Sequence, residues 1–194
     1  MNKFGRGVRA WRARREERGS VIVEAAIIVP LLIMLTFGAI EYGLAFRDSA
    51  AVASSTRAGA RIASAMTGQA SFADNAKLSV SDSLKDLTHT DPQTLVIFKA
   101  DANGNPLGGS FTGCSDCYQY TWNASNKTWT GPTNGSASWW TADEQKADAC
   151  AGALPSIGVY VKAKHKFITA LFGASTTFDH KTIMRLEPIS TDQC

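Results

Sequence analysis

The chain lacks the short motifs with which many enzymes bind phosphate, dinucleotides or catalytic metals. No phosphate-binding loop, nucleophile elbow, dinucleotide glycine fingerprint or paired metal motif occurs in its 194 residues. The three histidines, His89, His165 and His180, are isolated from one another in the sequence. We therefore expect no enzymatic activity, no small-molecule substrate, no cofactor and no metal ion.

Cysteine is absent from the first 113 residues, and Cys114, Cys117, Cys150 and Cys194 all follow a long apolar run. Cys114 and Cys117 have the spacing of a zinc or redox pair, but a structural zinc needs two further ligands at suitable spacing. A catalytic dithiol should lie where a strand leads into a helix. An even number beyond a membrane favours disulfides. Of the three possible pairings we prefer Cys117–Cys150 with Cys114–Cys194, because both close long loops.

Charge is absent from Ala25 to Ile40, inside an apolar run that extends from Val21 to Phe46. The full run reaches the roughly 20 residues that cross about 30 Å of hydrocarbon. Residues 1–18 hold seven basic side chains against two glutamates, and such an excess normally stays in the cytoplasm rather than marking a nucleic-acid site. The sequence predicts a single-pass cell-membrane protein with a cytoplasmic N-terminus, an extracytoplasmic C-terminal domain and no nucleic-acid partner.

Two glutamates and a proline interrupt the apolar run. Glu24 lies one turn inside it, where a charged side chain is costly and usually has a partner and a role; the alternative is that Glu24 reaches the cytoplasmic headgroups. Pro30 removes one helix hydrogen bond, which a membrane helix tolerates as a bend. Glu41 lies beside Tyr42 at the distal end, where aromatic residues anchor helices at the interface. We expect this pair to reach the headgroups and mark the membrane boundary.

The stretch from Arg18 to Glu24 resembles a type IV prepilin processing site, in which a basic leader ends in glycine and glutamate is fifth in the mature chain. The longer string that ends at Gly43 resembles the TadE-like family of the tight-adherence (Flp-type) pilus. It shares the glutamate, Pro30 six residues later and an isoleucine-glutamate-aromatic-glycine ending. Many relatives carry an aromatic residue after the first glutamate, whereas this chain has Ala25.

The resemblance implies a non-enzymatic minor pilin or pseudopilin that is a component or assembly factor of the pilus. It implies processing by a prepilin peptidase after Gly19, which would make Ser20 the first residue. Its partners would be the membrane, the prepilin peptidase, other pilin subunits and the pilus assembly platform. The transmembrane residues implied in assembly are Glu24, Pro30, Glu41, Tyr42 and Gly43.

Processing after Gly19 would create an α-amino group on Ser20, four positions from Glu24. If the amine of one subunit meets Glu24 of its neighbour, both charges are neutralised by a contact that exists only in the assembled stack. The spacing therefore favours assembly of processed subunits in register.

Two other functions remain compatible with the same residues. An uncleaved membrane-anchored binding protein shares the topology but requires neither Gly19 nor Glu24. A secreted protein would use the apolar run as a signal peptide, with Ala51, Val52 and Ala53 as its cleavage signal. That apolar region would be too long for a signal peptide and would start at a glutamate.

The predicted fold is α+β: a long N-terminal helix followed by a small, mostly antiparallel β domain with short helices, as in a type IV pilin. We expect the helix to continue to Met66; the alternative is a break at Gly43. The expected regions are a basic leader (1–19), a transmembrane helix (20–46), a helical extracytoplasmic stalk (47–92) and a disulfide-bearing β-rich domain (93–194).

Local patterns place the shorter elements. A capping-box-like start at 71–74 and apolar residues every three or four positions predict a helix that ends at Asp91-Pro92. A second helix should start at Thr141. Residues 93–100, 118–122, 127–130, 156–167 and 175–186 are predicted strands, the second and third forming a hairpin. We interpret Trp122, Trp129, Trp139 and Trp140 as cross-strand packing, or else as a binding surface for carbohydrate or protein.

Overall fold

The computed structural model describes residues 6–133, 139–152, 154–190, 192 and 194, with residues 6–18 described by their backbone alone. The chain forms two compact units, Met1–Gly43 and Leu44–Cys194. Of the predicted basic leader (1–19), only Gly19 is fully described. The predicted stalk (47–92) and the predicted β-rich domain (93–194) belong to the same compact unit.

One helix, α1 (Arg6–Ala65), contains the whole apolar run and continues beyond it. It begins inside the basic segment, earlier than the start expected at residue 20. It passes through Pro30 and Gly43 without a break and ends one residue before Met66. The predicted continuation of the helix is thus confirmed. The part from Gly19 to Ala65 is long and apolar enough, by length and composition, to cross a membrane.

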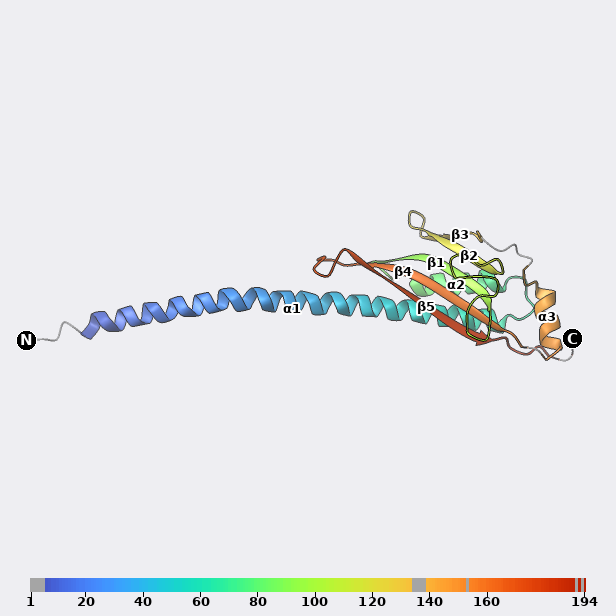
Figure 1. Cartoon of the computed structure of the whole chain (residues 1–194), viewed down its shortest axis with the longest axis horizontal. Coiled ribbons are helices and arrows are strands. Elements are labelled where there is room, and N and C mark those ends of the chain that lie inside the picture. The colour runs from blue at the N-terminus through green and yellow to red at the C-terminus, as the bar shows by residue number, and fades with distance from the viewer. Residues whose placement is uncertain (1–5, 134–138, 153, 191, 193) are drawn as a thin grey trace, which may run out of the picture. The chain divides into compact units, whose positions relative to one another are not determined.

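The second unit is built on a five-stranded sheet with the order β3-β2-β1-β4-β5, in which every neighbouring pair is antiparallel (Figure 1). The sheet, with the long helix before it, confirms the predicted α+β fold. Its strands are β1 (Thr90–Ala100), β2 (Cys117–Asn123), β3 (Thr128–Thr130), β4 (Ser156–Lys166) and β5 (Ser175–Arg185).

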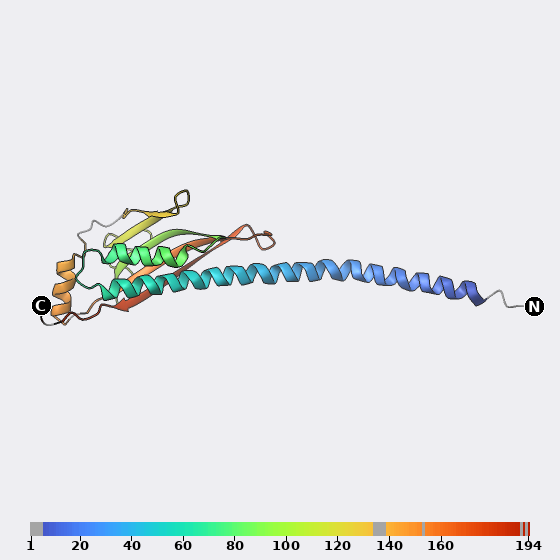
Figure 2. The same ribbon diagram turned by 180° about the vertical axis from the view of Figure 1, so that it is seen from behind.

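Two helices cover one face of this sheet, the C-terminal part of α1 and α2 (Phe72–Leu84), as the opposite views in Figures 1 and 2 show. The core between them holds small side chains from α1 and larger ones from α2 and the central strands. Gly59 permits this close packing, because a Cβ there would lie 2.6 Å from Val80 and 3.4 Å from Val159. The fully buried members include Val52, Ala60, Ala63, Phe72, Val80, Leu95, Ile97, Val159 and Val161.

The helix α2 starts where predicted but ends early and has a different cap. Ser71 occupies the N-cap position, yet its side chain makes no capping hydrogen bond among the described residues. The predicted capping box at this position is therefore wrong. By contrast, Thr141 forms a full capping box at the start of α3 (Ala142–Cys150), with the Glu144 amide donating to Thr141 Oγ1 over 3.2 Å.

The strand β1 starts at Thr90, three residues before the predicted start, and includes Pro92. A proline normally avoids central strands because it cannot donate to the ladder. Here the pairing with β2 covers only Thr94–Phe98, and the register with β4 shifts between Pro92 and Thr94. The irregularity accommodates the proline, so it does not end the element.

All four cysteines form disulfides, as predicted, but the preferred pairing is wrong. The bridges are Cys114–Cys117 and Cys150–Cys194. Cys114 and Cys117 are buried together with Val96, Phe98 and Tyr160, in a second small cluster of the sheet, whereas Cys150 ends α3. Loop length favoured the long bridges, but the positions of the side chains decide the pairing.

Candidate functional site

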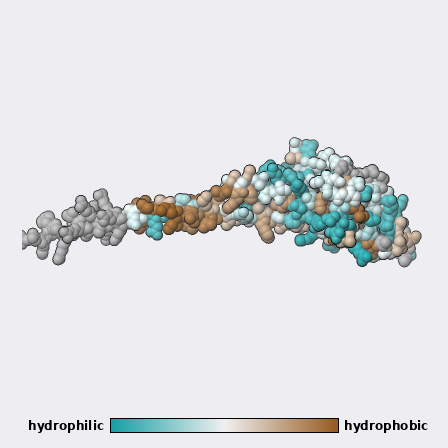
Figure 3. Space-filling view, in the orientation of Figure 1, coloured by the Kyte–Doolittle hydropathy of each residue, from teal (hydrophilic) through white to brown (hydrophobic). Residues whose placement is uncertain are grey.

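From Val21 onward, the helix of the first unit carries large apolar side chains that are exposed (Figure 3). From Val21 to Ile40, the exposed fractions of the large apolar side chains range from 46% to 68%. An exposed apolar surface of this size marks contact with a membrane or a partner. Because the residues have the length of a bilayer span, we treat this segment as one candidate functional site.

The predicted processing residues lie at the start of this segment. Gly19, Ser20 and Glu24 are all exposed on α1, and Ser20 and Glu24 share one helix face because they are four residues apart. A Cβ at Gly19 would meet no described atom within 4 Å. The packing of this chain therefore does not require glycine at position 19.

The predicted boundary residues differ from one another. Tyr42 is 58% exposed, whereas Glu41 is 2% exposed. That this pair reaches the headgroups and marks the membrane boundary stays a prediction. A Cβ at Gly43 would meet no described atom within 4 Å, so the fold does not require that glycine either.

In the second unit, α1 contacts the sheet through a buried polar cluster that the sequence analysis missed. The Thr90 hydroxyl donates to Asp48 Oδ2 over 2.7 Å, and the same oxygen lies 3.0 Å from His165 Nδ1. Each of the three residues is less than 5% exposed. Burying a carboxylate is costly unless it is hydrogen-bonded, so this cluster fixes α1 to β1 and β4.

The geometry of this cluster differs from that of a catalytic triad. Thr90 Oγ1 lies 2.9 Å from His165 Nδ1, the nitrogen that also contacts Asp48. In a triad the carboxylate and the nucleophile bind opposite nitrogens of the imidazole, so that the ring can take a proton from one side. With both groups at Nδ1, the arrangement is suited to holding the helix on the sheet.

Further polar contacts follow along α1. Ser49 Oγ lies 2.9 Å from His180 Nε2, and Thr56 Oγ1 lies 2.8 Å from Thr182 Oγ1. Both partners belong to β5. The small hydroxyl side chains of this alanine-rich stretch could have signalled a helix packed against a sheet rather than lipid, since small residues permit close approach.

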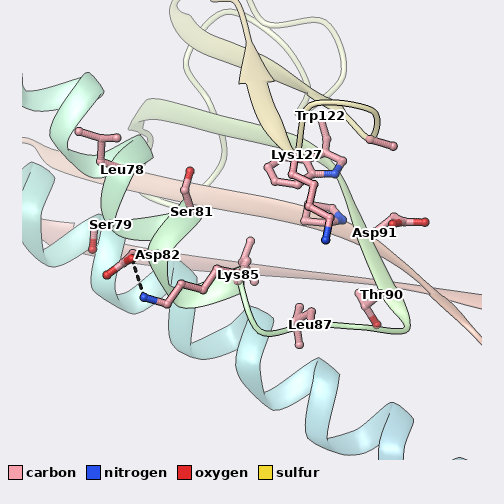
Figure 4. A pocket seen from close by; sticks show the side chains of 13 residues that line it. Leu78, Ser79, Ser81, Asp82, Lys85, Leu87, Thr90, Asp91, Trp122 and Lys127 are labelled. Carbon is pink, nitrogen blue, oxygen red and sulfur yellow. Dashed lines mark hydrogen bonds and ion pairs between the residues drawn. The ribbon is translucent and has the colours of Figure 1, made fainter.

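A cavity of about 560 Å³ opens between α2, the start of β1 and the β2–β3 hairpin (Figure 4). Two ion pairs lie at it: Lys85–Asp82 at 3.0 Å, and Lys166–Asp91 at 2.7 Å, of which Asp91 lines the cavity. The hydrogen bond to Asp82 raises the pKa of the exposed Lys85 ammonium group. With Trp122 also in its lining, the cavity offers an aromatic surface and charges of both signs, which suits binding.

The predicted cross-strand packing holds for Trp122 and Trp129, whereas Trp139 and Trp140 lie outside the strands and pack against Tyr118 and Phe72. Trp122 and Trp129 are cross-strand neighbours with ring centroids 5.0 Å apart. Trp140 is 2% exposed and packs edge-on against Phe72. The alternative of a binding surface has support only at Trp122, which lines the cavity.

An exposed apolar helix and an α+β unit whose sheet packs against the same helix suggest a protein with a single-pass membrane anchor. Residues 19–61 match the family model described as TadE-like protein. The predicted resemblance is confirmed for this segment, which contains the span and the polar contacts of α1 up to Thr56. The match suggests a protein associated with a tight-adherence pilus. No curated protein and no solved structure matched the chain.

Proposed function

We propose that the chain is a minor pilin or pseudopilin of a tight-adherence (Flp-type) pilus, either in the fibre or as an assembly factor, without enzymatic activity. The observation that carries the proposal is the TadE-like match over a segment in which an exposed glutamate, Glu24, directly precedes a charge-free stretch of the helix, Ala25 to Ile40. In this function the leader is cytoplasmic and the disulfide-bearing unit is extracytoplasmic. The two disulfides support that side of the membrane, because such bonds persist in oxidising compartments.

A prepilin peptidase cuts the proposed precursor after Gly19. A Cβ at this position would meet none of the described atoms within 4 Å, which supports a role for Gly19 in recognition by another protein. Cleavage frees an α-amino group on Ser20, on the helix face that also carries Glu24.

Assembly then pairs the Ser20 amine of one subunit with Glu24 of a neighbour. A charged side chain costs roughly 2.5 to 3.5 kcal/mol at the centre of a membrane helix, and less near the interface. The intersubunit pair removes part of this cost, so processed subunits in register are favoured over single subunits. Pro30 bends the helix, and Gly43 leaves room for a neighbouring helix to approach.

The test compares Glu24→Gln with Glu24→Asp in cells that make the pilus. Glutamine keeps the size of the side chain but cannot pair with an amine as a charge, whereas aspartate keeps the charge. We expect the glutamine variant to be lost from the pilus-associated envelope fraction and the aspartate variant to be partly retained. Recovery of Glu24→Gln at the wild-type level would remove the pairing mechanism.

The second candidate function is an uncleaved membrane-anchored binding protein. The cavity lined by Trp122 is the observation that favours it. This protein would keep its leader, and both Glu24 variants would reach the membrane at wild-type levels. The N-terminal residue of the mature chain therefore separates the two functions.

A further inference from the structure

The loop that joins β4 to β5 is apolar and exposed, unlike most of the surface around it. Residues 167–174 read FITALFGA and contain no charged side chain. Ile168 is 59% exposed, Leu171 is 41% exposed and Phe172 is 51% exposed. The last strand pair before the loop is Lys166 with Ser175, so the loop extends past the paired part of the hairpin, which reaches beyond β1 (Figure 1). Clustered apolar side chains at an exposed tip mark an interaction surface.

The contacts of α1 within the second unit show which end of the sheet carries this loop. Asp48 contacts His165, one residue before the end of β4 and two before the loop. Thr56 contacts Thr182, farther along β5, and Ser64 Oγ lies 3.9 Å from Met184 Sδ. In this unit α1 therefore starts at the loop end of the sheet and runs away from it.

The chain that precedes Asp48 is the end of the apolar run. Leu44 to Phe46 precede it, separated from it only by Arg47, and Phe46 is 78% exposed. At about 1.5 Å per residue, Phe46 is about 3 Å along the helix axis from Asp48. The apolar loop and the last apolar turn of the run thus belong to the same end of the second unit.

Two basic side chains, Arg47 and Lys166, lie at this end. Arg47 is exposed on α1, and Lys166, 64% exposed, pairs with Asp91 next to the loop. Lysine and arginine commonly place their stems along apolar surface and their charges at the headgroups. An apolar tip with basic residues behind it has the amphipathic pattern of a segment that lies in the membrane interface.

We propose that the β4–β5 loop inserts Ile168, Leu171 and Phe172 into the membrane interface beside the end of the span. The lipid surface is the partner, because the residues before Asp48 continue into the apolar run. The loop is a second membrane contact that holds the second unit against the bilayer. This inference rests on the membrane anchor that forms part of the proposed function, but not on processing or on the pilus.

The experiment places the photo-crosslinking residue p-benzoylphenylalanine at one position of the full-length chain, reconstituted in vesicles of phosphatidylcholine and phosphatidylglycerol. The test position is Leu171. The matched control is Leu107, which has almost the same exposure, 39% against 41%. Leu107 follows the Ala100 end of β1, about 33 Å along the strand from the Thr90 end at about 3.3 Å per residue. Leu32, 54% exposed within the span, is the positive control for lipid capture.

We expect lipid adducts, detected by mass, at positions 171 and 32 and none at position 107. Adducts at position 32 without adducts at position 171, or crosslinks from position 171 to a second copy of the chain, would overturn the proposal while leaving the anchor intact. Equal lipid capture at positions 171 and 107 would also overturn it, because the contact would not be specific to the loop. Release of the protein from the vesicles by alkaline carbonate would overturn the anchor and the loop contact together.

Discussion

The two units share one helix, but its side chains differ in size and exposure between them. From Val21 to Ile40, α1 carries leucine, isoleucine and valine side chains that remain exposed, and Glu24 within this stretch is exposed too. After Gly43 it carries mainly alanine, serine and threonine, buries Val52 and Ala60, and directs its carboxylate at Asp48 into a hydrogen-bonded cluster. The difference teaches that one continuous helix can change its surroundings, from an exposed apolar surface to close packing on a sheet, and that the size of the side chains reveals the change.

We expect the largest loss of stability in the second unit from removal of the Cys150–Cys194 disulfide, because both disulfides lie in that unit. Replacing Cys150→Ser together with Cys194→Ser opens a loop with a sequence separation of 44. The loop-entropy relation gives a loss of about 4 kcal/mol for this bridge and about 2 kcal/mol for the short bridge at Cys114 and Cys117. Urea unfolding in detergent, followed by tryptophan fluorescence, measures both. A larger loss of unfolding free energy from removal of Cys114–Cys117 than from removal of Cys150–Cys194 would contradict this prediction.

The Asp48 cluster provides the next largest effect. We expect Asp48→Ala to lower the free energy of unfolding by about 3 kcal/mol, since Thr90 and His165 each lose a buried partner. The control is Asp82→Ala, which removes an exposed ion pair to Lys85 and should cost about 0.5 kcal/mol or less. The same urea titration compares them. Equal effects would show that α1 is not held on the sheet by this cluster.

Alanine substitutions at two glycines of α1 compare the two units through a smaller change in stability. Gly59→Ala forces a Cβ toward Val80 at 2.6 Å and should destabilise the second unit by about 1 kcal/mol, after overpacking is offset by better helix propensity. Gly43→Ala meets no described atom within 4 Å and should leave the stability unchanged or slightly raised. Thermal unfolding of both variants decides the point. If Gly59→Ala stabilised the protein as Gly43→Ala does, the close packing of α1 on α2 would be wrong.

Much of the fold could be predicted from periodicity. The two long strands β4 and β5 were predicted to within one residue at each end, because their alternation is long and turn residues bound them. The end of α2 and the start of β1 could not, because Pro92 was taken as a stop signal although it lies at an irregularity of the ladder. The sequence around Pro92 does not show that β1 is unpaired with β2 at this residue, so it does not show that the strand can contain a proline there.

Part of the candidate site could likewise be predicted from the sequence, and part could not. The membrane segment could be predicted because its signal is local: composition, spacing of Gly19 and Glu24, and length. The cluster of Asp48, Thr90 and His165 could not, because its members are 42 to 117 residues apart in sequence. The disulfide pairing failed for a different reason. Loop entropy favoured bridges between distant cysteines, whereas Cys114 and Cys117, which are close in sequence, pair with each other in a buried cluster.

The most direct test of the proposed function is the N-terminal residue and intact mass of the chain, recovered from membranes of cells that contain the cognate prepilin peptidase. The account predicts a start at Ser20, loss of that start in Gly19→Ala, and normal cleavage of the control Gly43→Ala, which alters another exposed glycine of α1. An uncut chain that starts at Met1 would contradict it in favour of a membrane-anchored binding protein, and a start at Ser54 would indicate a secreted domain.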